Sequence, residues 1–216
     1  MNGAGINAGR SGNVSARTPG GMLVTPTGMA YDALKPADIV AMDMDGRATG
    51  PRLPSSEWRF HLDIYRARAE VGAVVHTHST HATALSCQRR GIPAFHYMVA
   101  AAGGEDIRCA PYATFGTEAL SRNALDALSG RRACLLANHG AIATGPTLAE
   151  AFDLAAAVEV LAAQYLAALQ GGRPVLLPKA EMKRVLAQFA GAGYGQQPPA
   201  RNAKRPGRGA RGASKA

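Results

Sequence analysis

The sequence has too few cysteines for a fold held together by disulfide bonds. Its three cysteines, Cys87, Cys109 and Cys134, are odd in number and widely spaced. Disulfide-dependent domains and cysteine-based zinc sites both need cysteines in closely spaced sets. We therefore expect a protein of a reducing compartment such as the cytoplasm.

Long apolar runs are absent as well. No uninterrupted apolar stretch approaches the ~20 residues that span a bilayer, and the first residues lack the basic region and apolar core of a signal peptide. Hydrophobic residues nevertheless make up 47% of the 216 residues, which is enough for a sizeable core. We therefore expect one domain, residues 1–195, without a membrane segment.

Acidic residues and large apolar side chains are missing from residues 196–216. Six of the nine net positive charges of the protein lie there, among prolines and glycines. Such a segment cannot bury enough surface to offset its loss of conformational entropy, so we expect a disordered basic tail. We expect non-specific contacts of this tail with nucleic acids at most, and not a nucleic-acid-binding function.

Hydrophobic periodicity and end signals predict short strands mixed with longer helices. Thr117 and Thr147 are the expected N-caps of two helices, and Glu150 completes a capping box with Thr147. The expected helices cover residues 55–68, 80–89, 117–128, 147–169 and 179–189. The expected strands cover residues 21–25, 39–43, 73–78, 92–98 and 134–138. This mixture is typical of an α/β protein.

Three of the six histidines lie where two apolar strands are expected to end. His76 and His78 are two residues apart, so their side chains share one face of a strand, and His139 follows the next apolar strand. Three imidazoles with an open fourth position are the pattern of a catalytic zinc site. Each ring could equally be a hydrogen-bonded core histidine, and the residues alone leave both interpretations open. We interpret His61 and His81, within expected helices, as packing or solvent-facing residues.

Three short segments offer backbone N–H groups and hydroxyls that suit an anion. They are residues 11–15, residues 25–28 and the serine pair 55–56 at an expected helix start. Each pattern is also common in plain turns and helix caps, so the residues alone do not decide. The sequence has no Walker loop and no dinucleotide-binding glycine motif.

Two further side chains suit acid–base chemistry. Glu57 lies in the first turn of an expected helix, where a carboxylate either complements the helix dipole or acts as a general base beside a metal. Tyr97, next to His96, is either a structural phenol or a proton donor. Composition and spacing leave these alternatives open.

Taken together, these residues resemble the class II aldolase/adducin family. The resemblance extends over residues 5–195. It rests on motifs in the order and spacing of the family, namely Gly12-Asn13-Val14-Ser15, Thr25-Pro26-Thr27-Gly28, Pro54-Ser55-Ser56-Glu57, Val75-His76-Thr77-His78 and Asn138-His139-Gly140. Two further segments, 92–104 and 109–116, resemble the bacterial L-fuculose-1-phosphate aldolase branch of the family.

The resemblance implies a three-layer α/β/α fold with a central, mainly antiparallel sheet. It also implies a homotetramer with active sites between adjacent subunits, and one Zn²⁺ per subunit as the cofactor. The implied reaction is cleavage of L-fuculose 1-phosphate, or of a related deoxy-ketose 1-phosphate. The products would be dihydroxyacetone phosphate and L-lactaldehyde or another short aldehyde.

The same resemblance assigns roles to individual residues. The implied metal ligands are His76, His78 and His139, with Glu57 near the open position and as the general base. Tyr97, from the neighbouring subunit, would serve the oxygen of the departing aldehyde. The implied phosphate pocket consists of Gly12, Asn13, Thr27, Gly28, Ser55 and Ser56. Phe115 and the C-terminal Tyr194 would lie beside the aldehyde end of the substrate.

Other members of the family keep alternatives open. Ribulose-5-phosphate 4-epimerases and methylthioribulose-1-phosphate dehydratases share the metal ligands, whereas an adducin-like module only binds partners. The presence of Glu57 with all three histidines favours an enzyme. Members of the family begin with a helix ahead of the segment that starts here at Gly5, so we expect this N-terminal helix of the domain to be missing.

Overall fold

The computed structural model describes residues 1–7 and 9–191. The expected basic tail, residues 196–216, lies outside the described residues, and so does Tyr194.

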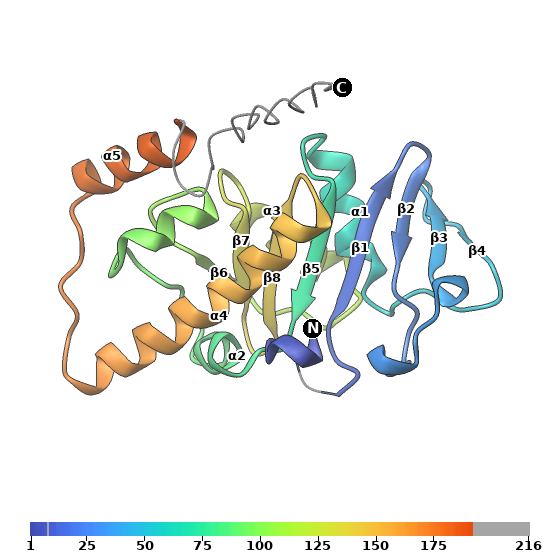
Figure 1. Ribbon diagram of the computed structural model, residues 1–216, viewed down its shortest axis with the longest axis horizontal. Coiled ribbons are helices and arrows are strands. Elements are labelled where there is room, and N and C mark those ends of the chain that lie inside the picture. Colours follow the sequence, from blue (N-terminus) through green and yellow to red (C-terminus); the bar gives the residue numbers. More distant parts are fainter. Residues whose placement is uncertain (8, 192–216) are drawn as a thin grey trace, which may run out of the picture.

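An eight-stranded sheet runs through the middle of the described chain, in the order β4-β3-β2-β1-β5-β8-β7-β6 (Figure 1). All neighbouring strands are antiparallel except β6 and β7, which are parallel. The strands are β1 (Asn13–Thr18), β2 (Gly21–Val24), β3 (Val40–Asp43), β4 (Ala48–Thr49), β5 (Ala73–Thr77), β6 (Arg108–Ala110), β7 (Ala133–Leu136) and β8 (Gly140–Gly145). The expected sheet, mainly antiparallel, is therefore confirmed.

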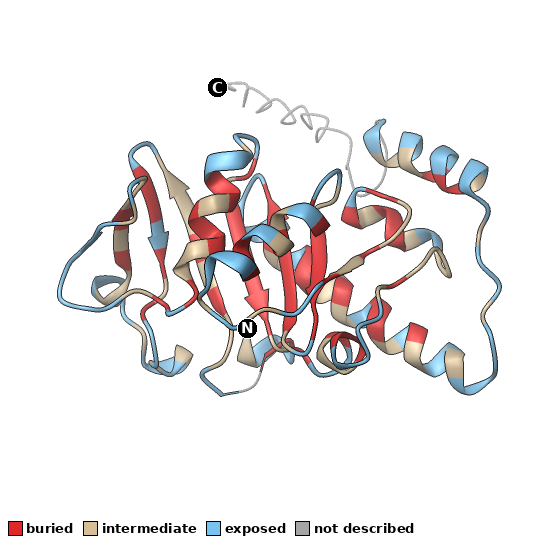
Figure 2. Ribbon diagram, turned by 180° about the vertical axis from the view of Figure 1, so that it is seen from behind, coloured by how far each residue is buried: buried red, intermediate tan, exposed pale blue. Residues whose placement is uncertain are grey.

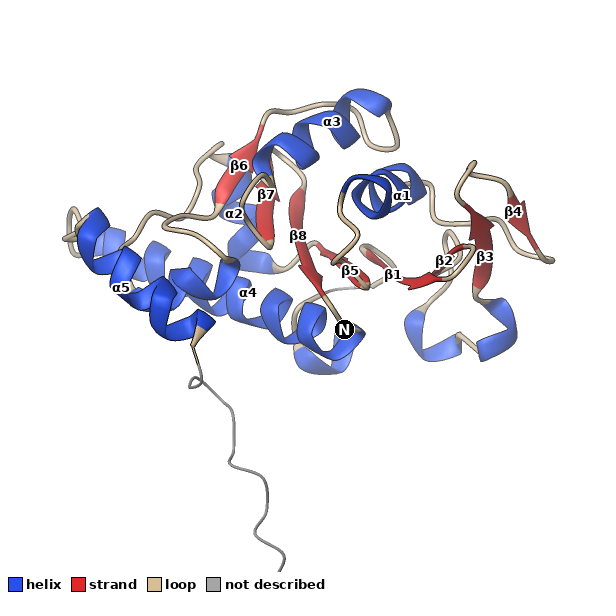
Figure 3. Ribbon diagram, turned by 90° about the horizontal axis from the view of Figure 1, so that it is seen from above, coloured by secondary structure: helices blue, strands red, loops and turns tan. Residues whose placement is uncertain are grey.

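Helices cover both faces of this sheet, which gives the expected three layers (Figure 3). The α-helices α1 (Trp58–Ala67) and α3 (Glu118–Ala127) lie on one face. On the other face lie α2 (Thr80–Cys87), α4 (Leu148–Gln170) and α5 (Lys179–Ala190). The described residues also contain the 3₁₀ helices η1 (Asn2–Ala4), η2 (Tyr31–Ala33), η3 (Pro36–Asp38) and η4 (Tyr97–Ala102).

Each face of the sheet has its own apolar core, and Figure 2 shows the buried residues concentrated in the central strands and the inner sides of the helices. Strand β5 is buried along its whole length and divides its side chains between the two cores. Val75 packs with the core beneath α4, whereas Val74 packs with the core beneath α1 and α3. His76 has the parity of Val74, so it faces the α1 side, where its ring meets the edge of Phe60.

Helix α4 is long and apolar enough to cross a membrane by length and composition. Its side chains Leu154, Val158 and Leu161 are buried in the core on one face of the sheet. This placement identifies α4 as a core helix of the domain.

The expected helices all form, with small shifts at their ends. Thr117 and Thr147 act as N-caps, because their side chains accept hydrogen bonds from the backbone N–H groups of Leu120 and Glu150. The first long helix begins at Trp58 and not at residue 55, with Glu57 in the N-cap position.

The strand expected at residues 92–98 is wrong. Ile92 forms only an isolated bridge with Ile107, and the chain then enters η4. Pro93 removes a backbone donor that a strand would need. Strands β1 and β8 were not predicted, and both of them flank the central strand β5.

Candidate metal centre and substrate cavity

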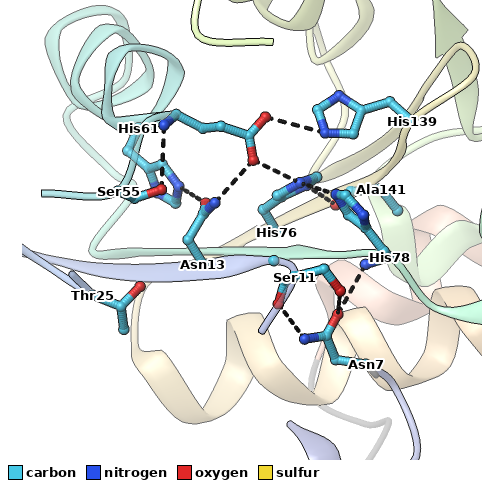
Figure 4. Close-up of polar contacts among 12 residues, drawn as sticks. Asn7, Ser11, Asn13, Thr25, Ser55, His61, His76, His78, His139 and Ala141 are labelled. Atoms are coloured by element: carbon cyan, nitrogen blue, oxygen red, sulfur yellow. Dashed lines mark hydrogen bonds and ion pairs between the residues drawn. The ribbon is translucent and has the colours of Figure 1, made fainter. Parts of the chain in front are cut away.

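The three histidines and the glutamate come together from separate elements at the C-terminal end of β5. His76 is the last residue but one of β5, His78 directly follows the strand, and His139 lies in the turn between β7 and β8. Glu57 occupies the N-cap of α1. One ligand atom from each of these four side chains lies within 4.8 Å of all the others (Figure 4).

The distances within this cluster fit a single metal ion. His76 Nε2 lies 2.9 Å from His78 Nε2 and 3.2 Å from Glu57 Oε2, and His139 Nε2 lies 3.1 Å from Glu57 Oε1. Ligands about 2.0 Å from a tetrahedral zinc ion are about 3.3 Å apart. The donor set, three imidazoles and a carboxylate, is also one that zinc accepts.

The hydrogen bonds around the cluster leave its ligand atoms ready for a cation. His76 Nδ1 lies 2.9 Å from the backbone oxygen of Ala141, which can only accept, so Nδ1 carries the proton. A neutral ring then directs the lone pair of Nε2 into the cluster. The buried Oε1 of Glu57 lies 3.1 Å from His139 Nε2 but accepts no hydrogen bond, and such an atom is costly unless a cation or a proton satisfies it.

The electrostatics of the cluster favour a neutral His78 beside an ionised Glu57. Burial and the adjacent His76 and His139 lower the pKa of His78 to about 4. Burial alone would raise the pKa of Glu57, but the neighbouring rings of His139 and His76 outweigh it and hold that pKa well below its usual range. A neutral imidazole and a carboxylate are the forms that bind a metal.

The three segments expected to bind an anion lie side by side next to this cluster. The Thr25 Oγ1 accepts a hydrogen bond from the Val14 backbone N–H, and the Ser55 backbone N–H donates to the Thr25 oxygen. Residues 26 and 54 form an isolated bridge, which joins the second and third segments. The structure therefore brings residues 11–15, 25–28 and 55–56 together.

Two glycines of these segments have conformations that other residues rarely adopt. Gly12 and Gly28 have φ angles of 72° and 69°. A Cβ on Gly12 would lie 2.6 Å from the backbone oxygen of His76, so only glycine allows this loop to approach the metal cluster so closely.

A cavity of about 330 Å³ opens beside the cluster. Phe115, expected at the aldehyde end of a substrate, is part of its wall. Two other wall residues, Tyr112 and Asn138, were not singled out from the sequence, although both belong to segments that carry the family resemblance. The full lining is Ser56, Glu57, His78, Tyr112, Ala113, Phe115, Asn138 and His139.

Tyr97 does not line the cavity of its own subunit. It begins η4, its ring stacks on that of His96 with centroids 4.8 Å apart, and it is 43% exposed. Of the residues expected in the phosphate pocket, only Ser56 lines the cavity; the others, Gly12, Asn13, Thr27, Gly28 and Ser55, do not.

His61 is a further residue beside the site whose role sequence reasoning missed. It is fully buried and takes part in a chain of hydrogen bonds that reaches the metal cluster (Figure 4). His61 Nε2 contacts Asn13 Oδ1, and Asn13 Nδ2 lies 3.0 Å from Glu57 Oε2. The helical position of His61, one turn after Glu57, was the available signal, because residues i and i+4 share a helix face.

Sugar-phosphate aldolases are among the known proteins with similar sequences and structures. The family model described as the Class II Aldolase and Adducin N-terminal domain matches residues 1–166. The chain is 56% identical over 195 residues to the 5-methylthioribulose-1-phosphate/5-deoxyribulose-1-phosphate aldolase of Rhodospirillum rubrum, covering 90% of this chain and 88% of that protein. It is 50% identical over 186 residues to the L-fuculose phosphate aldolase of Escherichia coli, covering 86% of each. A solved structure of an L-fuculose 1-phosphate aldolase matches with a TM-score of 0.83 and 44% identity, covering 86% of this chain and 88% of that chain.

Proposed function

The chain belongs to the class II aldolase and adducin family, and from this premise we propose that it is a zinc-dependent aldolase for deoxy-ketose 1-phosphates. The reaction is cleavage between C3 and C4 of the ketose, which gives dihydroxyacetone phosphate and a short aldehyde. The observation that carries the proposal is the convergence of Glu57 with His76, His78 and His139 at the wall of a cavity.

Zinc bound by these side chains would act as a Lewis acid toward the oxygens of the substrate that gain negative charge. Glu57 then moves the proton at C3, because its carboxylate is ionised and belongs to the wall of the cavity. The loops of residues 11–15, 25–28 and 55–56 bind the phosphate, which does not react. This binding energy orients the reacting carbons against Glu57.

The cavity wall supports a substrate whose end opposite the phosphate is apolar. Tyr112, Ala113 and Phe115 contribute aromatic and methyl surface there. The relatives named above are, by their names, aldolases of 5-methylthioribulose 1-phosphate, 5-deoxyribulose 1-phosphate and L-fuculose phosphate. We therefore assign L-fuculose 1-phosphate or a 5-deoxy- or 5-methylthio-ribulose 1-phosphate as substrates, with L-lactaldehyde as the aldehyde product from L-fuculose 1-phosphate.

Tyr97 reaches the substrate from a neighbouring subunit of a homotetramer in this proposal. Its position away from its own cavity and its partial exposure support that arrangement. Tyr97 there donates a proton to, or accepts one from, the oxygen of the aldehyde. We assign Tyr194, which lies outside the described residues, to the same end of the substrate. The protein acts in the cytoplasm, where its sugar phosphates occur.

The test is cleavage of a panel of ketose 1-phosphates by zinc-loaded protein, with release of dihydroxyacetone phosphate as the readout. We expect cleavage of at least one deoxy-ketose 1-phosphate and loss of turnover after treatment with a chelator. Glu57→Gln should abolish proton exchange at the carbon of dihydroxyacetone phosphate, because it keeps the shape and removes the base.

Glu118→Gln is the matched control, since Glu118 is an exposed carboxylate on α3 that pairs with Arg122. It should turn over as the wild type does. Full activity in metal-free protein, or proton exchange at the wild-type rate in Glu57→Gln, would contradict the proposal.

A further inference from the structure

The hydrogen bonds between Tyr65 and Glu57 form one continuous buried chain. Tyr65 OH lies 2.8 Å from Ser15 Oγ, and Ser15 Oγ lies 2.7 Å from His61 Nδ1. His61 Nε2 contacts Asn13 Oδ1, and Asn13 Nδ2 lies 3.0 Å from Glu57 Oε2. Each of these five side chains is buried, so water cannot replace a missing partner.

Because Glu57 at one end can only accept hydrogen bonds, the donor and the acceptor of each hydrogen bond in the series are determined. An ionised carboxylate can only accept, so Asn13 must turn its NH₂ group toward Glu57 and its carbonyl toward His61. His61 must then donate from Nε2. A neutral ring that donates from Nε2 accepts at Nδ1, so Ser15 donates to His61 and Tyr65 donates to Ser15.

The other possible arrangements leave buried groups in conflict. With the proton on Nδ1, His61 would face the Asn13 oxygen with a lone pair. Turning the Asn13 amide over would relieve that contact, but would set its oxygen against Glu57 Oε2. A doubly protonated ring would satisfy both neighbours, but burial lowers the pKa of His61 to about 3, so the ring is neutral.

We propose that His61 is a positioning residue for Glu57, held in its Nε2–H tautomer by Ser15 and acting through the Asn13 amide. This proposal rests on the proposed function, in which Glu57 is the base. All four hydrogen bonds point their donors toward the carboxylate, which stabilises its charge and fixes its orientation. Asn13 thereby holds Oε2 and, through it, the orientation of the whole carboxylate toward the histidines.

The tautomer can be observed directly in the wild-type, zinc-loaded protein. Nitrogen chemical shifts of ¹⁵N-labelled histidine distinguish a protonated ring nitrogen from an unprotonated one, and the spectrum of His61→Gln identifies the signals of His61. We expect Nε2 protonated and Nδ1 unprotonated at pH 7. A ring protonated at Nδ1, or at both nitrogens, would overturn the proposal without any measurement of activity.

Two substitutions of His61 test the roles of its two ring nitrogens separately. Glutamine at position 61 can place its amide N–H near the position of Nε2 and still donate to Asn13. Asparagine is shorter and reaches only the side of Nδ1 and Ser15. His61→Asn should therefore weaken zinc binding, measured by competition with a chelator, and lower kcat, each by about 10–100-fold, with a smaller change in KM. His61→Gln should stay close to wild type in both measurements.

The matched control removes the hydrogen bond that lies farthest from Glu57. Tyr65→Phe removes the donor to Ser15 but leaves Ser15 able to donate to His61, so its effect on zinc binding should be much smaller than that of His61→Asn. A purely structural role would lower the melting temperature of His61→Gln and His61→Asn alike and leave zinc affinity equal in both. Equal zinc affinity and equal kcat in the two variants would therefore overturn the proposal.

These outcomes are distinct from a failure of the proposed function. Wild-type protein that cleaves no ketose 1-phosphate would refute the function, while the tautomer and zinc competition would still report on His61. Wild-type protein that cleaves the substrate while His61→Asn matches it in kcat and zinc affinity would refute the role of His61 alone.

Discussion

At the scale of single residues, the side chains that meet the metal could be predicted, whereas the side chains that hold them could not. His76, His78 and His139 follow apolar runs, and strand ends of one sheet bring such residues together. The partnership of His61 with Asn13 joins an α-helix to a strand 48 residues away in the chain. Periodicity placed His61 within a helix, as a packing or solvent-facing residue, and says nothing about which polar group meets it there.

The burial of His61 makes the protein sensitive to acid in a way that one substitution can reveal. Its pKa of about 3 in the folded state lies below the ~6.5 of an unfolded chain. The unfolded chain therefore binds a proton that the folded one does not, so stability falls as pH decreases from about 6.5 to about 3. The fall is at most about 1.4 kcal/mol per pH unit for this group.

We expect His61→Gln to remove this contribution. Urea unfolding of metal-free protein at pH 4, 5 and 6 should show one fewer proton taken up on unfolding in the variant than in the wild type. An identical dependence of the unfolding free energy on pH in the two proteins would contradict the assignment of a neutral, buried ring.

At the scale of elements, residue chemistry explains which strands could be predicted. Strand β5 has an uninterrupted β-branched and apolar run, and it forms as expected. Strand β8 begins and ends with glycine and is rich in alanine, so its propensity for a strand is weak. It forms because it is completely buried between β5 and β7, where tertiary packing outweighs propensity. Strand β1 begins at Asn13, directly after Gly12, and a Gly-Asn pair is typical of a turn; pairing with β2 and β5 overrides that signal.

The contact between β5 and β8 depends on a glycine next to the metal ligands. A Cβ on Gly140 would lie 2.3 Å from the Thr77 backbone oxygen and 3.1 Å from His78 Cδ2. Gly140→Ala should therefore push the two strands apart where His78 and His139 meet, costing about 1–3 kcal/mol of stability. It should also weaken zinc binding by about 10-fold or more.

Chelator competition and thermal unfolding measure these two effects. The control is Gly171→Ala at the end of α4, where the nearest atom to an added Cβ is 3.6 Å away and φ is −81°. That variant should bind zinc as the wild type does. Wild-type zinc affinity in Gly140→Ala would show that the two strands tolerate the separation.

At the scale of the whole molecule, β5 divides the sheet into one part formed by the strands that precede it in the sequence and one formed by the strands that follow it. Strands β1 to β4 lie on one side of β5, and β6 to β8 lie on the other. The metal ligands come from α1, from β5 and from the turn between β7 and β8. A bound ion therefore joins segments from both halves of the sheet. The layers of this fold could be predicted through the family resemblance, but the strand order depends on pairings between distant segments that local patterns do not encode.

A metal ion that joins the two halves should stabilise the whole domain. At a free zinc concentration about 100 times the dissociation constant, the gain is about 2.7 kcal/mol. Calorimetric unfolding should therefore show a higher melting temperature with zinc than with a chelator. His139→Ala removes one ligand and should abolish most of this difference. An increase of the same size in His139→Ala would place the stabilising zinc elsewhere.

The position of β5 also determines when the metal centre can arise during protein synthesis. Its two neighbours in the sheet are β1, which precedes it by more than 50 residues, and β8, which begins more than 60 residues after it. While the ribosome is still making the segment between β5 and β8, β5 has only one flank covered and His139 does not yet exist. The nascent chain therefore passes through a long stage in which it cannot hold the ion as the finished protein does. We therefore expect the metal to bind late, after β8 has been synthesised and has paired with β5.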